Sequence, residues 1–250
     1  MQSPKEIILK QLEIFNDPLF RYEPKYHKYA YDGVPFKPVT KFIEQFHEPF
    51  KQDFWSKEKA EEEGISQEEM LKRWKDKNDY ANLIGSVTHQ WIEDYFNQIY
   101  QPLPDNLDVI HRINKFNTIY AKQLCKLEPL IFEVKVFSKK WKIAGTIDSL
   151  FLFRGKIYII DWKTNGEYRD DDHPKGHFEK LLHPFEEFFK NHMNEYSIQV
   201  SLYASILEDA GFEVGGAYIV HIGPDEEPAK IHKVIDMREK LKMYLDGQAQ

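Results

Sequence analysis

Apolar residues recur at helical spacing through most of the first half of the chain, and this pattern predicts a series of helices. Residues 3–6 form a capping box with proline at the first helical position. A second capping box at residues 66–69 precedes a long run of helically spaced apolar positions. We expect this long helix to break near Asn78 or Gly85, because neither residue favours a helix interior.

The segments between these helices differ in character. Residues 17–38 are rich in Pro, Tyr, His and Lys without sustained periodicity, which predicts an irregular segment lying over the surface. A helix capped by Thr40 is expected to run through Phe50. Another is expected over about residues 107–126, with Pro129 closing it.

The second half of the chain has the pattern of a sheet with helical cover. Three strand-like segments joined by short polar turns, the second at residues 154–155, predict an antiparallel meander over 130–137, 142–153 and 156–161. A helix ending at Gly211, a buried strand, an edge strand and a last helix capped from Asp236 are then predicted, over 198–210, 217–222, 231–235 and 236–245. The order is that of an α/β sheet sandwich.

Length and composition agree with one soluble domain. The chain has 250 residues, of which 42% are hydrophobic, enough for one large core. We expect residues 1–128 to form a mainly helical cover and residues 129–250 an α/β core. No apolar run approaches the roughly 18 residues that span a bilayer, and the N-terminus lacks the apolar stretch of a signal peptide. The expected location is the cytoplasm, without a membrane partner.

The formal net charge of −7 argues against a protein that coats duplex DNA through a broad basic face. It leaves room for a nuclease, because a site that gathers carboxylates around a metal is locally acidic. Local basic stretches, residues 135–142 with Arg154 and Lys156, are candidates for guiding a strand.

Cys125 is the only cysteine, and this excludes several kinds of site. An intramolecular disulfide, a zinc ribbon and the thiolate cage of an iron–sulfur cluster all need more cysteines than the chain has. We expect Cys125 to be a packed core thiol.

Two carboxylates and an amine at the end of one β-hairpin are the strongest chemical feature. Asp148 lies in one predicted strand and Asp161 at the end of the next, and each is embedded in apolar residues. Burial of an unpaired carboxylate is costly, so a cation is expected beside them. Lys163 shares a face with Asp161 by strand alternation. The three groups can hold Mg²⁺ or Mn²⁺ and stabilise charge on a phosphate, although a plain Asp161–Lys163 salt bridge is the alternative.

The motifs in this region resemble those of the RecB-like branch of the PD-(D/E)XK nuclease superfamily. The resemblance rests on four segments in chain order, Gly85-Ser86-Val87-Thr88-His89, Gly145-Thr146-Ile147-Asp148, Ile160-Asp161-Trp162-Lys163-Thr164 and Gln199-Val200-Ser201-Leu202-Tyr203. It covers about residues 85–222. The implied fold is a restriction-endonuclease-like core, with a central mixed sheet in αβββαβ order under an N-terminal helical cover.

The resemblance also implies roles for individual residues. Asp148 and Asp161 would be metal ligands, and Lys163 the catalytic lysine. His89 would add a ligand from the preceding helix, and the backbone carbonyl of Trp162 would be the last metal ligand that the protein supplies. A packed or solvated histidine is the alternative for His89.

Three further residues are expected to support the site. The resemblance implies that Gln199 and Tyr203, four residues apart on one helical face, face the cleft; a polar pair bonded within the fold is the alternative. In related nucleases an acid like Glu133 supports the metal or binds it through water.

Residues 166–195 form a long polar connection with several aromatics. An arch over the cleft is one interpretation, in which these aromatics stack on unpaired bases; in the other they pack the loop down. The residues concerned are Phe178, Phe185, Phe188 and Phe189. The acidic run at residues 170–173 is expected to be a solvated turn, because consecutive side chains rarely converge on one ion.

The leading hypothesis is therefore a metal-dependent nuclease acting on DNA, as an exonuclease or a single-strand or flap-processing enzyme of phage or bacterial replication, recombination or repair. A structure-specific endonuclease with the same site is one alternative. A catalytically inactive nucleic-acid-binding subunit is another. The chain has no phosphate-binding loop of a helicase motor, so a helicase or single-strand-binding protein is a candidate partner.

Overall fold

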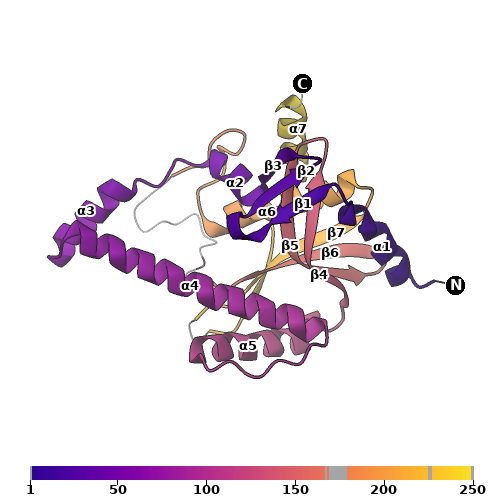
Figure 1. The fold of residues 1–250 in the computed structure, drawn as a ribbon, viewed down its shortest axis with the longest axis horizontal. Helices are drawn as coiled ribbons and strands as arrows, with labels where there is room; N and C mark the ends of the chain where they lie inside the picture. Colours follow the sequence, from indigo (N-terminus) through magenta and orange to yellow (C-terminus); the bar gives the residue numbers. More distant parts are fainter. Residues whose placement is uncertain (1, 167, 169–178, 225–226, 249–250) are drawn as a thin grey trace.

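The computed structural model describes residues 2–166, 168, 179–224 and 227–248, and its centre is an eight-stranded mixed sheet (Figure 1). The strands are β1 (Phe20–Glu23), β2 (Lys28–Tyr31), β3 (Val34–Pro38), β4 (Glu128–Ser138), β5 (Ile143–Phe153), β6 (Lys156–Lys163), β7 (Val214–His221) and β8 (Lys230–Lys233). Their order is β1-β2-β3-β5-β6-β7-β8, with β4 pairing β5. The pairs β3–β5 and β6–β7 are parallel and the others antiparallel. The expected α/β architecture is confirmed.

Helices cover both faces of this sheet. They are α1 (Pro4–Leu12), α2 (Val39–Ile43), α3 (Gln52–Glu63), α4 (Gln67–Phe96), α5 (Leu107–Ile119), α6 (His192–Asp209) and α7 (Arg238–Gln248). The long α4 and the shorter α5 lie side by side below the sheet, and α3 packs on the far end of α4 (Figure 1). The described part of the chain includes no helix with both the length and the apolar character needed to cross a lipid bilayer.

The predicted meander is confirmed: β4 pairs antiparallel with β5, and β5 with β6. Arg154 and Gly155 both have positive φ, as a two-residue hairpin turn requires. The capping box of α1 is also present, since Ser3 Oγ accepts from the Glu6 backbone and Glu6 bonds back to the Ser3 N–H. Gly211, at φ 92°, follows α6 as expected.

The expectation of an irregular segment over residues 17–38 is wrong, because β1, β2 and β3 lie there. Each strand has only four or five residues, too few to give a visible period. Asp32 and Gly33, both with positive φ, join β2 to β3 in the tight turn that Asp-Gly favours. That dipeptide was the available signal.

The long helix α4 does not break at Asn78 or Gly85 and runs for 30 residues. Ser66 caps it by accepting a hydrogen bond from the Glu69 N–H. Residues 75–83 are exposed on every side, so the helix bridges solvent between α3 and the body of the protein. This stretch contains no proline and carries i,i+4 ion pairing, which keeps an unsupported helix intact.

Three other local expectations need correction. Thr40 lies inside α2, which ends at Ile43 and continues only as a 3₁₀ turn to Phe46. Pro129 lies within β4 and not at a helix end, since α5 gives way to a π-helical turn over Tyr120–Leu124. Cys125 is exposed, so it is not a core thiol.

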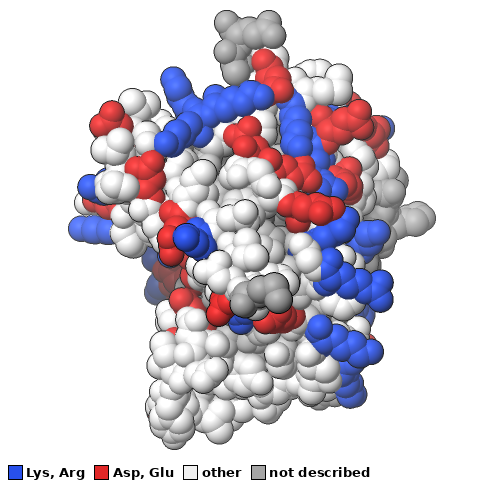
Figure 2. Space-filling view, turned by 90° about the vertical axis from the view of Figure 1, so that its right-hand side faces the viewer, with Lys and Arg blue, Asp and Glu red and all other residues white. Residues whose placement is uncertain are grey.

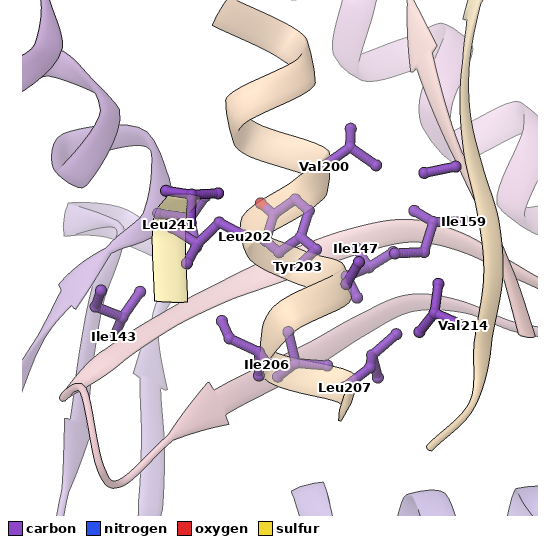
Figure 3. Packing of buried hydrophobic residues seen from close by; sticks show 14 of the residues in the cluster. Ile143, Ile147, Ile159, Val200, Leu202, Tyr203, Ile206, Leu207, Val214 and Leu241 are labelled. Atoms are coloured by element: carbon purple, nitrogen blue, oxygen red, sulfur yellow. The ribbon is translucent and has the colours of Figure 1, made fainter. Parts of the chain in front are cut away.

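Apolar packing joins the sheet to helices on both faces. Val200, Leu202, Ile206 and Leu207 of α6 pack over strand residues such as Ile147, Ile159 and Val214 (Figure 3). A second cluster on the α4 and α5 side contains Ile92, Phe116, Ile160, Trp162 and Val220. Strand β6 thus alternates its side chains between the two clusters, which places Asp161 and Lys163 on the α6 side.

Within the connection 166–195, the described aromatics favour packing over an arch. Phe185 is fully buried, and its ring centroid lies 4.9 Å from that of Phe46. Phe188 is partly buried against the same core cluster. Phe178 and residues 170–173 lie outside the described residues.

Charges on the face at the right of Figure 1 are mixed. Figure 2 shows Lys and Arg side chains along its upper rim and one edge, with Asp and Glu between them and a lower part that is almost free of charge. This face offers no continuous basic surface to a duplex.

Candidate metal centre and cleft

Three acids lie in a row across the central strands. Phe132 pairs with Ser149 and Val134 with Ile147, so Glu133 of β4 lies opposite Asp148 of β5. Ser149 in turn pairs with Ile160, which brings Asp148 level with Asp161 at the end of β6. Neighbouring positions across strands are close enough to interact directly. Burial raises the pKa of both other acids, and the charge of Asp148 raises it further, in agreement with this proximity.

His89 of α4 joins two of these acids. Its Nδ1 lies 3.6 Å from Asp148 Oδ2 and 4.0 Å from Glu133 Oε1. Donor atoms of the three residues all lie within 4.8 Å of one another, the size of a metal-ligand set. His89 therefore points toward the acids and not into solvent. Glu133 supplies one of the three close donor atoms, so it is a candidate ligand and not only an acid that supports the ligands.

Asp161 has a different environment from Asp148. Its side chain is only 3% exposed, and Lys163 Nζ lies 2.8 Å from its Oδ2. Among the described residues, no donor meets the geometry of a hydrogen bond to that oxygen. Burial raises the pKa of Asp161 to about 6, against the lowering effect of Lys163. The salt bridge that was the alternative to a metal site is therefore present, and it leaves this buried carboxylate oxygen without an aligned hydrogen bond from the described residues.

Lys163 is held by three neighbours. Besides Asp161, its Nζ donates to Gln199 Oε1 at 3.2 Å and lies 4.4 Å from the ring centroid of Tyr196, over the ring face. Burial lowers the pKa of Lys163, but the charges of Asp161 and Asp148 outweigh it, so the pKa is raised and the ammonium persists. Gln199 and Tyr196 both belong to α6. Lys163 reaches them because the alternation of side chains along β6 directs it toward this helix.

Glu133 carries two signs of a specialised position. Its φ is +48°, a left-handed conformation that costs energy for a non-glycine residue and concentrates at functional sites. Burial, followed by the charge of Asp148, raises the pKa of Glu133 to about 7. A bound cation would offset the part of this shift that comes from repulsion by Asp148.

Trp162 orients Asp148 through its backbone. Its N–H donates to Asp148 Oδ2 at 2.9 Å, while its buried indole Nε1 donates to Ser149 Oγ at 2.7 Å. Trp162 lines the cleft, so its carbonyl remains a predicted ligand.

Gln199 and Tyr203 line the cleft and also interact with each other, so both interpretations of this pair hold in part. Burial raises the pKa of Tyr203 well above its usual value, opposed by the Gln199 hydrogen bond. Gly145 explains the close packing here: a Cβ at that position would lie 2.7 Å from Tyr203 Cε1. A larger residue would push the tyrosine aside.

Helix α4 approaches the sheet closely at Gly85. A Cβ there would lie 3.1 Å from Thr164 Oγ1, directly after β6. Arg112 of α5 holds the same strand end, since its Nη2 donates to the Thr164 carbonyl at 3.2 Å. His89 lies one helical turn beyond Gly85. The small residue therefore lets α4 deliver its histidine to the acids.

These side chains line a cleft of about 790 Å³. One wall is α4, with Asn78, Asn82 and Gln90. Tyr22, His27 and Lys135, from the β1–β2 hairpin and β4, form another part of the lining. This volume is in the range of small-molecule sites and fits a short piece of a sugar–phosphate chain.

Several of these residues were not predicted. Tyr196 lies three residues before Gln199 on the same helix face, which was a usable signal. Nothing local in the sequence indicated that Tyr22 and His27 reach the cleft. The basic stretch 135–142 contributes only Lys135, because Lys139 pairs with Asp17 and Lys140 with Asp246 on the surface.

The donor set suits a hard divalent cation. Carboxylate oxygens and one imidazole are ligands that Mg²⁺ and Mn²⁺ accept, and the unsatisfied Asp161 oxygen adds a fourth acceptor nearby. Among the described residues, no cluster of cysteines accompanies it.

Comparisons with known proteins do not extend this description. No family model matches the chain, and no curated protein matches it. A solved structure titled "Crystal structure of SSO0001" is similar over 66% of this chain and 68% of that one, at 16% identity and a TM-score of 0.27. A likeness at that score carries no argument about fold or function.

Proposed function

We propose that the chain is a metal-dependent nuclease that hydrolyses DNA phosphodiester bonds, with the site organisation of the RecB-like branch of the PD-(D/E)XK superfamily. The observation that carries this proposal is the convergence of His89, Glu133 and Asp148 within 4.8 Å, beside the buried Asp161–Lys163 pair. The mixed sheet with helices on both faces is compatible with it.

His89, Glu133 and Asp148 would hold Mg²⁺ or Mn²⁺, with Asp161 as a further ligand. A bound ion of this kind polarises a phosphoryl oxygen and lowers the pKa of water. The backbone N–H of Trp162 holds the Asp148 carboxylate in one orientation, so this carboxylate need not move when the metal binds.

Lys163 contributes positive charge at the cleft. Asp161, Gln199 and Tyr196 together restrict its ammonium to one position. A preorganised cation in a low-dielectric site stabilises the negative charge that develops on a phosphate in the transition state. The chain has the lysine and both acids, Asp148 and Asp161, and this favours an active enzyme over an inactive binding subunit.

A digestion panel tests the proposal. The purified chain is incubated with Mg²⁺, Mn²⁺ or EDTA on end-labelled single-stranded, duplex and flap DNA and on a single-stranded circle. We expect metal-dependent cleavage that Asp148→Asn and Lys163→Ala each reduce by about a hundredfold or more. Asp105→Asn, an exposed carboxylate before α5, is the matched control.

Survival of the circle supports exonuclease action, and its cleavage supports the endonuclease alternative. Absence of cleavage with either metal, in protein shown to be folded by circular dichroism, contradicts the proposal. So does equal activity in Asp148→Asn and Asp105→Asn.

A further inference from the structure

The β1–β2 hairpin, residues 20–31, differs in charge from the chain to which it belongs. It contains three cations, Arg21, Lys25 and Lys28, and a single acid, Glu23, in a protein of net charge −7. All four side chains are exposed. The hairpin also has five aromatic residues, a combination typical of surfaces that bind unpaired nucleic acid.

The hairpin is fixed next to the cleft. Tyr29 is buried and its hydroxyl lies 3.1 Å from Thr146 Oγ1 in β5, two residues before Asp148. The Tyr22 ring stacks on Tyr29 at 4.7 Å, and its hydroxyl lies 3.1 Å from His27 Nδ1. Tyr22 and His27 both line the cleft. The tip of the hairpin therefore adjoins the lining of the cleft.

The tip presents one ring with two ammonium groups. Tyr26 is 56% exposed, and Lys25 Nζ and Lys28 Nζ each lie 5.3 Å from its ring centroid. His27 reverses the chain here with φ +49°, donating its N–H to the Pro24 carbonyl. Exposed cation–π contacts are weak, so the lysines are free to leave the ring for a stronger anion.

We propose that this tip binds an unpaired DNA strand as it leaves the cleft. This inference rests on the proposed function. Lys25 and Lys28 contact two strand phosphates while a base stacks on Tyr26. A duplex fits less well, because its bases are already stacked and its phosphates call for a broader basic surface.

Salt-dependent binding tests the proposal without any cleavage. A fluorescein-labelled oligothymidylate is titrated in EDTA at several salt concentrations, with fluorescence anisotropy as the readout. On a single strand, each phosphate contact contributes about 0.7 to the steepness of a plot of log affinity against log salt concentration. Lys25→Ser with Lys28→Ser should therefore reduce the slope by about 1.4. Lys230→Ser with Lys233→Ser, at the opposite edge of the sheet, is the matched control and should keep it.

The aromatic contribution is measured separately. Tyr26→Ala should weaken binding at least about fivefold at one salt concentration, and Tyr26→Phe should restore it, since stacking needs only the ring. An unchanged slope in the double lysine variant overturns the proposal, as does wild-type protein that binds no strand.

Failure of the proposed function has a different signature. Hydrolysis of bis(p-nitrophenyl) phosphate with Mn²⁺ by the wild type, and its loss in Asp148→Asn, test the metal centre alone. A protein that binds the strand through the tip but hydrolyses neither ester nor DNA retains this inference and loses the nuclease assignment.

Discussion

The two sides of the cleft are built in opposite ways. On the sheet side, Asp161 and Lys163 form a charged pair that is 3% and 19% exposed, and Glu133 has a strained backbone. On the hairpin side, Lys25 and Lys28 are exposed, and each ammonium group lies 5.3 Å from the centroid of the Tyr26 ring.

This difference separates chemistry from binding. A buried charge has strong electrostatic effects but depends on its partners for stability, whereas an exposed charge can be lost with little effect on the fold. Substitutions on the sheet side should therefore change both stability and activity, and substitutions on the hairpin should change affinity alone.

The largest effect is expected from breaking the buried pair. Lys163→Met leaves Asp161 buried without its cation, and we expect a loss of about 3–5 kcal/mol in the free energy of unfolding at pH 8. Asp161→Asn combined with Lys163→Met should recover most of it. Urea denaturation of the wild type, Lys163→Met and the double variant measures these differences in the free energy of unfolding.

Lys156 is the matched control because it pairs with Glu213 at the other end of β6, on the surface. Lys156→Met should leave the free energy of unfolding nearly unchanged, because an exposed ion pair contributes little to stability. Equal losses for the two lysine variants would show that burial does not distinguish the two regions.

A smaller effect is expected from pH on the metal-free protein. In the folded protein, burial and the charge of Asp148 raise the pKa of Glu133 to about 7, above the 4.5 that is usual for a glutamic acid. Between these two values the folded state holds a proton that the unfolded state has released. The contribution of Glu133 to stability is therefore full below about pH 4.5 and is lost as pH rises to about 7. Glu133→Gln should remove about 1–2 kcal/mol of that fall.

Urea denaturation in EDTA at pH 5 and pH 8 measures this difference. Glu128→Gln, an exposed acid at the start of the same strand, should behave like the wild type. Part of the fall should remain in Glu133→Gln, because burial also raises the pKa of Asp161 to about 6. A wild type equally stable at both pH values contradicts the argument.

The smallest effect is expected at the hairpin tip. Lys25→Ser with Lys28→Ser should change the free energy of unfolding by less than about 0.5 kcal/mol, since both side chains are exposed. The same double variant is the one expected to lose strand affinity. If it unfolds as readily as Lys163→Met, the hairpin is part of the core and the comparison of the two sides fails.

Much of the central site could be predicted because its residues are close in sequence. Asp148 and Asp161 belong to strands joined by the short Arg154-Gly155 turn, whose geometry sets their register. Lys163 follows from strand alternation. Local rules also predicted both helix caps at Ser3 and Ser66.

The pattern by itself thus determined the meander, the face shared by Asp161 and Lys163, and the helical nature of the segment that carries His89, since each depends on neighbours a few residues away. Only the tertiary structure decided that α4 stays whole and turns His89 toward Glu133, that Tyr196 lies under Lys163, and that residues 20–31 form a wall of the cleft. These contacts join segments far apart in the chain. They depend on how closely helices and strands pack, as at Gly85 and Gly145, and periodicity carries no information about that distance.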